Sequence, residues 1–186
     1  EWAKRLGGVA EDQISSIAVD SLDRIIVAGS VIGDADFNSD GDVTDAEEDG
    51  TTGDSSAFVS VFSSGGVYQW SYRLVDLLDE SFSFAHSVSI DALDRIILSG
   101  DVIGDADLNR DGDMDDSGES ATGYGDIDVF VEVFSPAGAH QWAKRLGGIS
   151  IDKGLSVAVD SNDRVVASGL VAYEADLNGD GDAMDS

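Results

Sequence analysis

The chain contains the stretch IAVDSLDR at residues 17–24, and two close copies follow it, VSIDALDR at 88–95 and VAVDSNDR at 157–164. In each copy, apolar residues alternate with small or polar residues and then meet an Asp-containing turn. Alternation with a period of two predicts a half-buried β-strand, and the polar turn predicts where that strand ends. The copies lie 71 and then 69 residues apart, so the chain is an internal repeat.

Each repeat predicts four short strands, called a, b, c and d in chain order. In the first repeat they cover residues 16–20, 24–31, 57–62 and 67–74, with a Ser-Ser-Gly-Gly turn between c and d. In the second repeat, c and d cover residues 129–134 and 140–146. No segment has a sustained helical period. The predicted fold is all-β, with about 2.6 repeats of roughly 70 residues, each a four-stranded antiparallel unit resembling a propeller blade.

The d strand marks the unit boundaries. Its copies are EWAKRLGG at residues 1–8, QWSYRL at 69–74 and QWAKRLGG at 141–148. The predicted division is a lone d-type strand in 1–8 (Trp2–Leu6), repeat 1 in 9–75, repeat 2 in 76–147 and an incomplete repeat 3 in 148–186. A propeller closes with about 4 to 8 blades. Three alternatives follow: a piece of a longer protein, an open array of units, or neighbouring copies that complete each other.

An acidic loop separates strands b and c in each repeat. Its copies are DFNSDGD at residues 36–42, DLNRDGD at 107–113 and DLNGDGD at 176–182, each followed three residues later by another Asp. The formal net charge is −28, and 21 of the 38 acidic residues lie in or beside these loops. A disordered acidic tract would not keep Asn, Gly and Asp in one register three times. Oxygen ligands at alternate positions, with a Gly at the sharp turn, instead suit a loop around a hard cation.

The candidate metal ligands follow from counting along each loop from its first Asp. Oxygen-bearing side chains fall at positions 1, 3, 5, 7 and 10, with position 7 also offering its backbone carbonyl. Glu47 falls at position 12, where an EF-hand has a bidentate Glu, but the second loop has Gly118 there, which favours a simpler loop site. The candidates are Asp36, Asn38, Asp40, Asp42, Asp45 and Glu47; Asp107, Asn109, Asp111, Asp113 and Asp116; and Asp176, Asn178, Asp180, Asp182 and Asp185. We predict two to three structural Ca2+ ions, because Mg2+ demands stricter geometry and Zn2+ prefers His or Cys.

The repeat as a whole resembles a known family. The Trp of strand d, the Gly-Gly after it, the Val-Asp-x-x-x-Arg turn and the Phe-Val-x-Val-Phe-Ser strand c are similar to the SBBP-type bacterial β-propeller repeat. The acidic loops, which lie outside that repeat pattern, resemble calcium loops of dockerins, thrombospondin type 3 repeats and integrin-type propellers. The resemblance implies blade-like units and loops that bind Ca2+.

The composition and net charge of the chain disfavour several classes of function. The strong negative charge disfavours nucleic acid and anionic membranes as partners, and no apolar run of about 18 residues predicts a membrane span. The chain has no Cys, and His86 and His140 do not recur in register, so we predict no catalytic triad and no enzymatic activity. Calcium loops of low affinity work where Ca2+ is abundant, which favours an extracellular or cell-surface location of bacterial type.

The predicted role is therefore structural or adhesive. Open strand edges at the incomplete repeat predict self-assembly of copies, head to tail and fibre-like, with Trp2–Leu6 as the donated strand. The alternative is a fragment of a larger secreted propeller that binds a glycan or a cell-surface protein. A third alternative is part of a secreted hydrolase. For the recurring Trp2, Trp70 and Trp142 we predict packing between units, and for the matching Arg an acidic partner.

Overall fold

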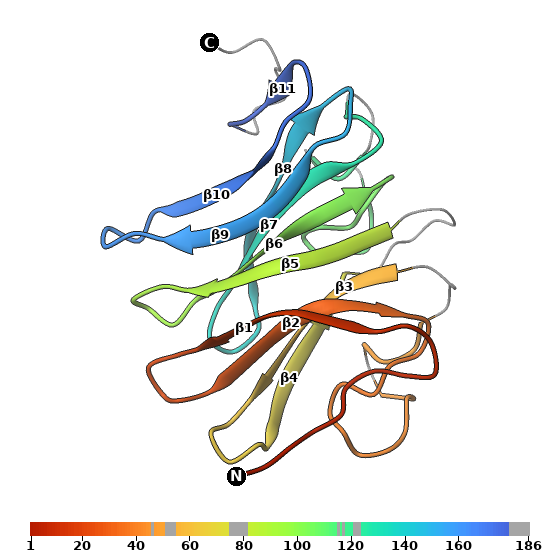
Figure 1. The fold of residues 1–186 in the computed structure, drawn as a ribbon, viewed down its shortest axis with the longest axis vertical. Helices are drawn as coiled ribbons and strands as arrows, with labels where there is room; N and C mark the ends of the chain where they lie inside the picture. Colours follow the sequence, from red (N-terminus) through yellow and green to blue (C-terminus); the bar gives the residue numbers. More distant parts are fainter. Residues whose placement is uncertain are drawn as a thin grey trace.

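The computed structural model describes residues 1–45, 47–50, 55–74, 82–114, 116, 118–120 and 124–178. Within these residues the chain forms antiparallel sheets and no helix, as the sequence predicts. The sheets lie one above another along the long axis of the molecule, and the N-terminal segment and β11 lie at opposite ends (Figure 1). Among the described residues there is no helix long and apolar enough to cross a membrane.

Three sheets correspond to the three repeats, except that β11 of repeat 3 pairs with β8 of repeat 2. The first has the order β1-β2-β3-β4, the second β11-β8-β7-β6-β5 and the third β10-β9. The strands are β1 (Gln13–Val19), β2 (Ile25–Ile32), β3 (Ser55–Phe62), β4 (Tyr68–Arg73), β5 (Phe82–Ile90), β6 (Ile96–Ile103), β7 (Asp128–Phe134), β8 (His140–Gly148), β9 (Lys153–Val159), β10 (Val165–Leu170) and β11 (Ala175–Asp176). The sequence thus predicted strands a to d of the first two repeats and strands a and b of the third. None of these sheets closes on itself within the described residues.

The structure forms no strand at Trp2–Leu6, where the sequence predicts one. In the complete units a d strand pairs with a c strand, as β8 pairs with β7, whereas no c strand among the described residues pairs with Trp2–Leu6. The segment instead lies across unit 1, where the Trp2 indole N–H donates to the Ser64 carbonyl at 2.9 Å. Its single ladder contact is the bridge between Gly7 and Asp36.

Apolar side chains join neighbouring units face to face. Strand β5 lies against β1, β2 and β3, and β9 lies in the same way against β5, β6 and β7. The largest buried cluster crosses from unit 1 to unit 2 and includes Val59, Tyr72, Leu98, Phe130 and Phe134. Strands β2 and β6 are buried along almost their whole length, which explains why strand b of these two units is a nearly continuous apolar run.

Asp side chains cap the a–b turns. Asp20 accepts backbone N–H bonds from Leu22 at 3.0 Å and Arg24 at 2.8 Å, and Asp91 and Asp160 make the same pair of bonds in their own turns. An Asp side chain that accepts N–H bonds two and four residues on stabilises a tight turn. All three turns therefore share one geometry, and they place each b strand in the same register.

Candidate metal centre

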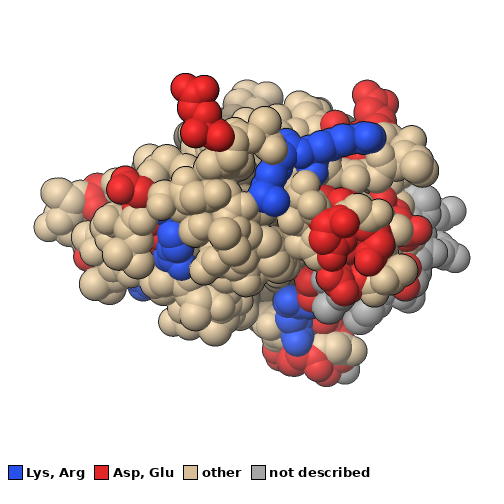
Figure 2. All heavy atoms as spheres, turned by 90° about the horizontal axis from the view of Figure 1, so that it is seen from below, with Lys and Arg blue, Asp and Glu red and all other residues tan. Residues whose placement is uncertain are grey.

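The acidic loops lie on one side of the stacked sheets. The first runs between β2 and β3 and the second between β6 and β7, while the third begins after β10. Seen from the N-terminal end, acidic side chains gather toward one side of the molecule, with Lys and Arg side chains next to them (Figure 2). The b–c connections of successive units thus share one edge of the molecule.

In the first loop, carboxylate and amide oxygens accept hydrogen bonds from the loop's own backbone. Asp36 Oδ2 accepts from the Gly41 N–H at 3.0 Å, and Asn38 Oδ1 accepts from the Asp40 N–H at 2.7 Å. The Asn38 amide donates to Asp45 Oδ2 at 2.8 Å, so positions 3 and 10 are joined. These bonds wrap the chain around a small centre, as a cation loop requires.

The second loop repeats this pattern residue for residue. Asp107 Oδ2 accepts from the Gly112 N–H at 3.0 Å, and Asn109 Oδ1 accepts from the Asp111 N–H at 2.8 Å. The Asn109 amide donates to Asp116 Oδ2 at 2.5 Å. Two loops of different sequence outside the motif therefore adopt one arrangement.

The glycines sit where the backbone turns, as the sequence predicts. Gly41 has φ 99° and Gly112 has φ 95°, values that disfavour a residue with a Cβ atom. Position 4 is also left-handed, with φ 65° at Ser39 and φ 62° at Arg110. Non-glycine residues adopt this conformation rarely, so its recurrence indicates that the loop contacts hold it in place.

Glu48 and Glu119, at position 13 of the two loops, were missed by the sequence reasoning. Glu48 Oε1 accepts from the Phe37 N–H at 2.8 Å and the Asn38 N–H at 3.2 Å, and Glu119 Oε1 accepts from the Asn109 N–H at 3.0 Å. Both side chains are buried. Aligning the first two loops beyond the shared Asp at position 10 would have revealed this recurring Glu.

One group of carboxylates lies close enough to share an ion. Oxygens of Asp107, Asp111 and Glu119 all lie within 4.8 Å of one another. Ca2+ binds oxygens at about 2.3–2.6 Å, so two ligands of one ion lie at most about 5 Å apart. The donor set is all oxygen, and no His or Cys lies in the group. These residues fit a hard divalent cation, and one bound there would neutralise carboxylates that otherwise repel one another.

Glu47 is engaged elsewhere. One of its carboxylate oxygens pairs with the Arg110 guanidinium of the second loop, and the other accepts from the Arg73 N–H at 3.2 Å. In the third loop, Asp176 is buried and accepts from the Asn178 N–H at 3.1 Å. The remaining predicted ligands of that loop, Asp180, Asp182 and Asp185, lie outside the described residues.

The buried glutamates carry an electrostatic cost. Burial raises the pKa of Glu48 above its ordinary value, and the N–H bonds from Phe37 and Asn38 oppose this rise only in part. Burial likewise raises the pKa of Glu119, against the N–H bonds from Asn109 and Asp116. Each carboxylate therefore lies where negative charge is unfavourable without a nearby cation.

Trp70 of the recurring Trp residues packs at a junction between units, and Arg145 of the recurring Arg residues pairs within its own unit. The Trp70 indole N–H donates to the Pro136 carbonyl at 3.3 Å and its ring packs near Phe134, with centroids 6.2 Å apart. Arg145 pairs with Asp128 at 2.7 Å, both side chains fully buried. These contacts agree with the predicted packing and pairing roles.

No protein-family model matches the chain, and a search of curated proteins found no match either. The resemblance to SBBP-type repeats therefore stays a prediction.

Proposed function

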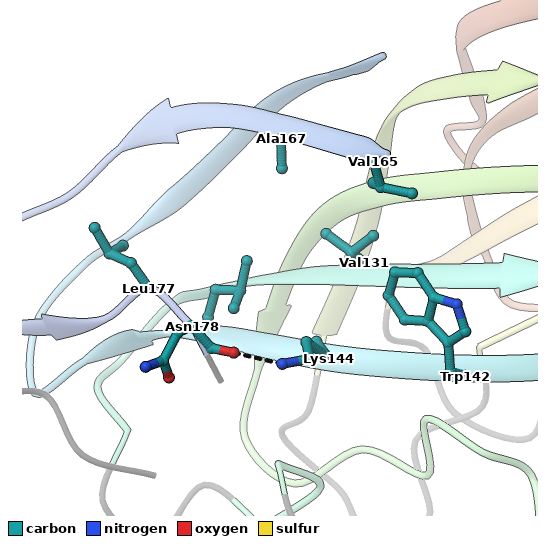
Figure 3. Close-up of a pocket in the computed structure, with 8 residues that line it drawn as sticks. Val131, Trp142, Lys144, Val165, Ala167, Leu177 and Asn178 are labelled. Carbon is teal, nitrogen blue, oxygen red and sulfur yellow. Dashed lines mark hydrogen bonds between the residues drawn. The ribbon is translucent and has the colours of Figure 1, made fainter. Parts of the chain in front are cut away.

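We propose that this chain is a non-enzymatic, calcium-binding β-repeat protein of the cell surface or extracellular space. Its role is structural or adhesive, and its copies assemble head to tail by adding a strand to the open edge of β10. Bound Ca2+ holds the b–c loops, which carry most of the negative charge, in one conformation. The observation that carries the proposal is an unfilled groove beside β10 (Figure 3).

The groove has a volume of about 220 Å³ and lies between unit 2 and β10. Trp142, Lys144 and Leu146 of β8 form one wall, and Val165 and Ala167 of β10 form the other. Figure 3 shows the Val165 and Ala167 side chains directed toward the side where Val131 and Trp142 lie, with the Lys144 ammonium donating to the Asn178 carbonyl. Such an apolar groove, beside a strand edge that has no partner among the described residues, favours an added strand.

The equivalent space between units 1 and 2 is filled. There Trp70, Tyr72 and Leu98 pack around Phe130 and Phe134 of β7, which pairs with β6. The Tyr72 and Phe134 rings lie with centroids 4.6 Å apart. Unit 3 has no described strand in the position of β7. Its groove therefore lacks two large apolar side chains spaced four residues apart on one strand face.

The N-terminal segment has this spacing. Trp2 and Leu6 are four residues apart, so on a strand both would point to one face. Trp2 is 43% exposed, so it is available to another chain. Antiparallel addition of this segment to β10 of a second copy would place both side chains over the groove. That contact joins different surfaces of two copies, and such contacts generate rings or filaments.

Light scattering and electron microscopy test the assembly. In millimolar Ca2+ we expect the mass of the wild-type chain to rise with concentration, and the double variant Trp2→Ala/Leu6→Ala to stay monomeric. Ala167→Arg, on the groove side, should block assembly equally, while Val9→Ala, at a fully exposed residue, should not. Far-UV circular dichroism checks that every variant is folded. A wild-type chain that stays monomeric at high concentration would overturn assembly and favour the glycan- or protein-binding alternative.

A further inference from the structure

Two buried glutamates lie on the interior side of the first two acidic loops. Glu48 is 1% exposed and Glu119 is 2% exposed, whereas Asp40 and Asp111 of the motif are exposed. Each Glu is anchored through its backbone, because the Glu48 carbonyl accepts from the Ala35 N–H and the Glu119 carbonyl from the Ala106 N–H, both at 2.9 Å. The carboxylate is therefore held at a fixed place below the loop.

The two N–H bonds that the Glu48 side chain accepts do not explain why this residue is a charged Glu rather than a neutral Gln. Oε1 accepts both N–H bonds, and Oε2 is buried without a hydrogen-bond partner. A glutamine could accept the same two N–H bonds through its amide oxygen. A buried carboxylate oxygen without a partner is costly, so its presence indicates a positive group that the protein chain itself does not supply.

We propose that Glu48 and Glu119 are metal ligands, each binding Ca2+ from the interior side of its loop. This rests on the proposed calcium binding. The second loop supplies the geometry, since a Glu119 oxygen lies within 4.8 Å of oxygens of Asp107 and Asp111. The first loop supplies the free ligand atom, Glu48 Oε2, in a loop with the same hydrogen bonds.

This ligand set differs from an EF-hand in its final position. Glu47, at position 12, turns away to Arg110 and Arg73 with φ 74°, and Glu48, at position 13, faces the loop. Position 1 lies just after strand b and position 13 near the end of the loop. One ion bound at both positions therefore ties the start of the loop to its end and restricts the chain that leads into strand c.

The test is calcium titration of the full chain after chelator treatment, by calorimetry. Glu48→Gln and Glu119→Gln each keep an N–H acceptor and remove the charge. We expect each variant to lose the tighter binding at one site, with a dissociation constant at least tenfold weaker, and the double variant to lose it at two. Matched controls are Asp49→Asn and Asp126→Asn, which remove one exposed charge near the same loops. They should bind Ca2+ within about twofold of wild type, because a solvent-exposed charge that does not contact the ion is screened.

Thermal melts separate a ligand from a purely structural residue. In EGTA the Glu48→Gln variant should unfold at the same or a higher temperature than wild type, because a buried charge has gone and Oε1 alone accepts both N–H bonds. Glu119→Gln also loses the acceptor of the Asp116 N–H and should unfold at a slightly lower temperature. In Ca2+ both variants should gain less from the ion than wild type does. Unchanged dissociation constants, or melting temperatures lowered equally with and without Ca2+, would overturn the role of the two glutamates while leaving calcium binding intact. A wild-type chain that takes up no Ca2+ would overturn both.

Discussion

Units 2 and 3 carry nearly the same strands in very different surroundings. Strand β6 of unit 2 is buried along almost its whole length, whereas β10 of unit 3, which has the same position in its repeat, is exposed along almost its whole length. The difference comes from what covers each strand. Strand β6 has β7 at its edge and β9 across its face, and β10 pairs only with β9 among the described residues. Whether a strand of this repeat is buried therefore depends on a complete unit and a neighbouring unit that cover it, rather than on the strand's own sequence.

The largest effect is expected at the Arg that recurs in strand d. The Arg145 side chain is fully buried and bonds to Asp128 through Nε at 3.0 Å, whereas Arg5, its copy in the N-terminal segment, is exposed. Arg145→Leu should lower the free energy of unfolding by about 3–5 kcal/mol, because Asp128 is left as a buried unpaired charge. Arg5→Leu should change it by less than about 0.5 kcal/mol. Urea denaturation measures both.

A second substitution checks the cause. Arg145→Met combined with Asp128→Leu removes both charges, so we expect it to restore most of the lost stability. Failure of this double variant to recover any stability would show that packing of the Arg side chain, rather than the unpaired charge, causes the loss.

A core substitution compares the two b strands directly. Ile97 of β6 is 1% exposed and packs against Val157 of the next unit, while Val166, at the same repeat position in β10, is 53% exposed. Ile97→Ala should cost about 2–5 kcal/mol, because it opens a cavity in a packed interface. Val166→Ala should cost less than about 0.5 kcal/mol. Equal losses in urea denaturation would mean that β10 is covered in solution.

The sequence predicted the strands and turns that recur in each repeat, and it missed the features that depend on contacts with neighbouring segments. Alternation and turn residues placed β1 to β4 correctly, because those signals are local. The N-terminal Trp2–Leu6 forms no strand despite its close copy in β8, since pairing needs a neighbouring c strand, and β3 and β7 already pair with β4 and β8. Glu48 and Glu119 at position 13 were not predicted, because the EF-hand spacing has its final Glu at position 12, which is Glu47. Whether a side chain turns inward or outward at the end of a loop depends on contacts such as Arg110 with Glu47.

The junction between units 1 and 2 should respond to pH. Tyr72 of β4 donates to Glu132 of β7 at 2.6 Å, and both are fully buried, whereas unit 1 has Ser60 at the position of Glu132. Burial raises the pKa of Glu132 to about 8, against 4.5 in the unfolded chain. The folded chain thus holds a proton that the unfolded chain has lost, so this contribution to stability is complete below pH 4.5 and disappears as the pH rises to about 8.

Glu132→Gln tests this assignment, since an amide oxygen can still accept from Tyr72 and does not titrate. We expect the variant to be more stable than wild type by about 2–4 kcal/mol above pH 8 and to differ little from it at pH 4.5. Denaturation curves in EGTA across this range give the comparison without metal. A constant difference between variant and wild type at every pH would exclude titration of Glu132 as the cause.

The smallest effect is expected at the a–b turns, which share the same Asp-to-backbone bonds and differ in exposure. The Asp20 side chain is fully buried beneath Arg24, whereas the equivalent pair in unit 3, Asp160 and Arg164, has side chains 27% and 75% exposed. Asp20→Ala should cost about 1–2 kcal/mol, because two backbone N–H groups lose their acceptor. Asp160→Ala should cost less, since water replaces the lost bonds. Thermal melts of the two variants at one pH measure the difference, and a larger loss at Asp160 would mean that the turn of unit 3 is buried by a second copy.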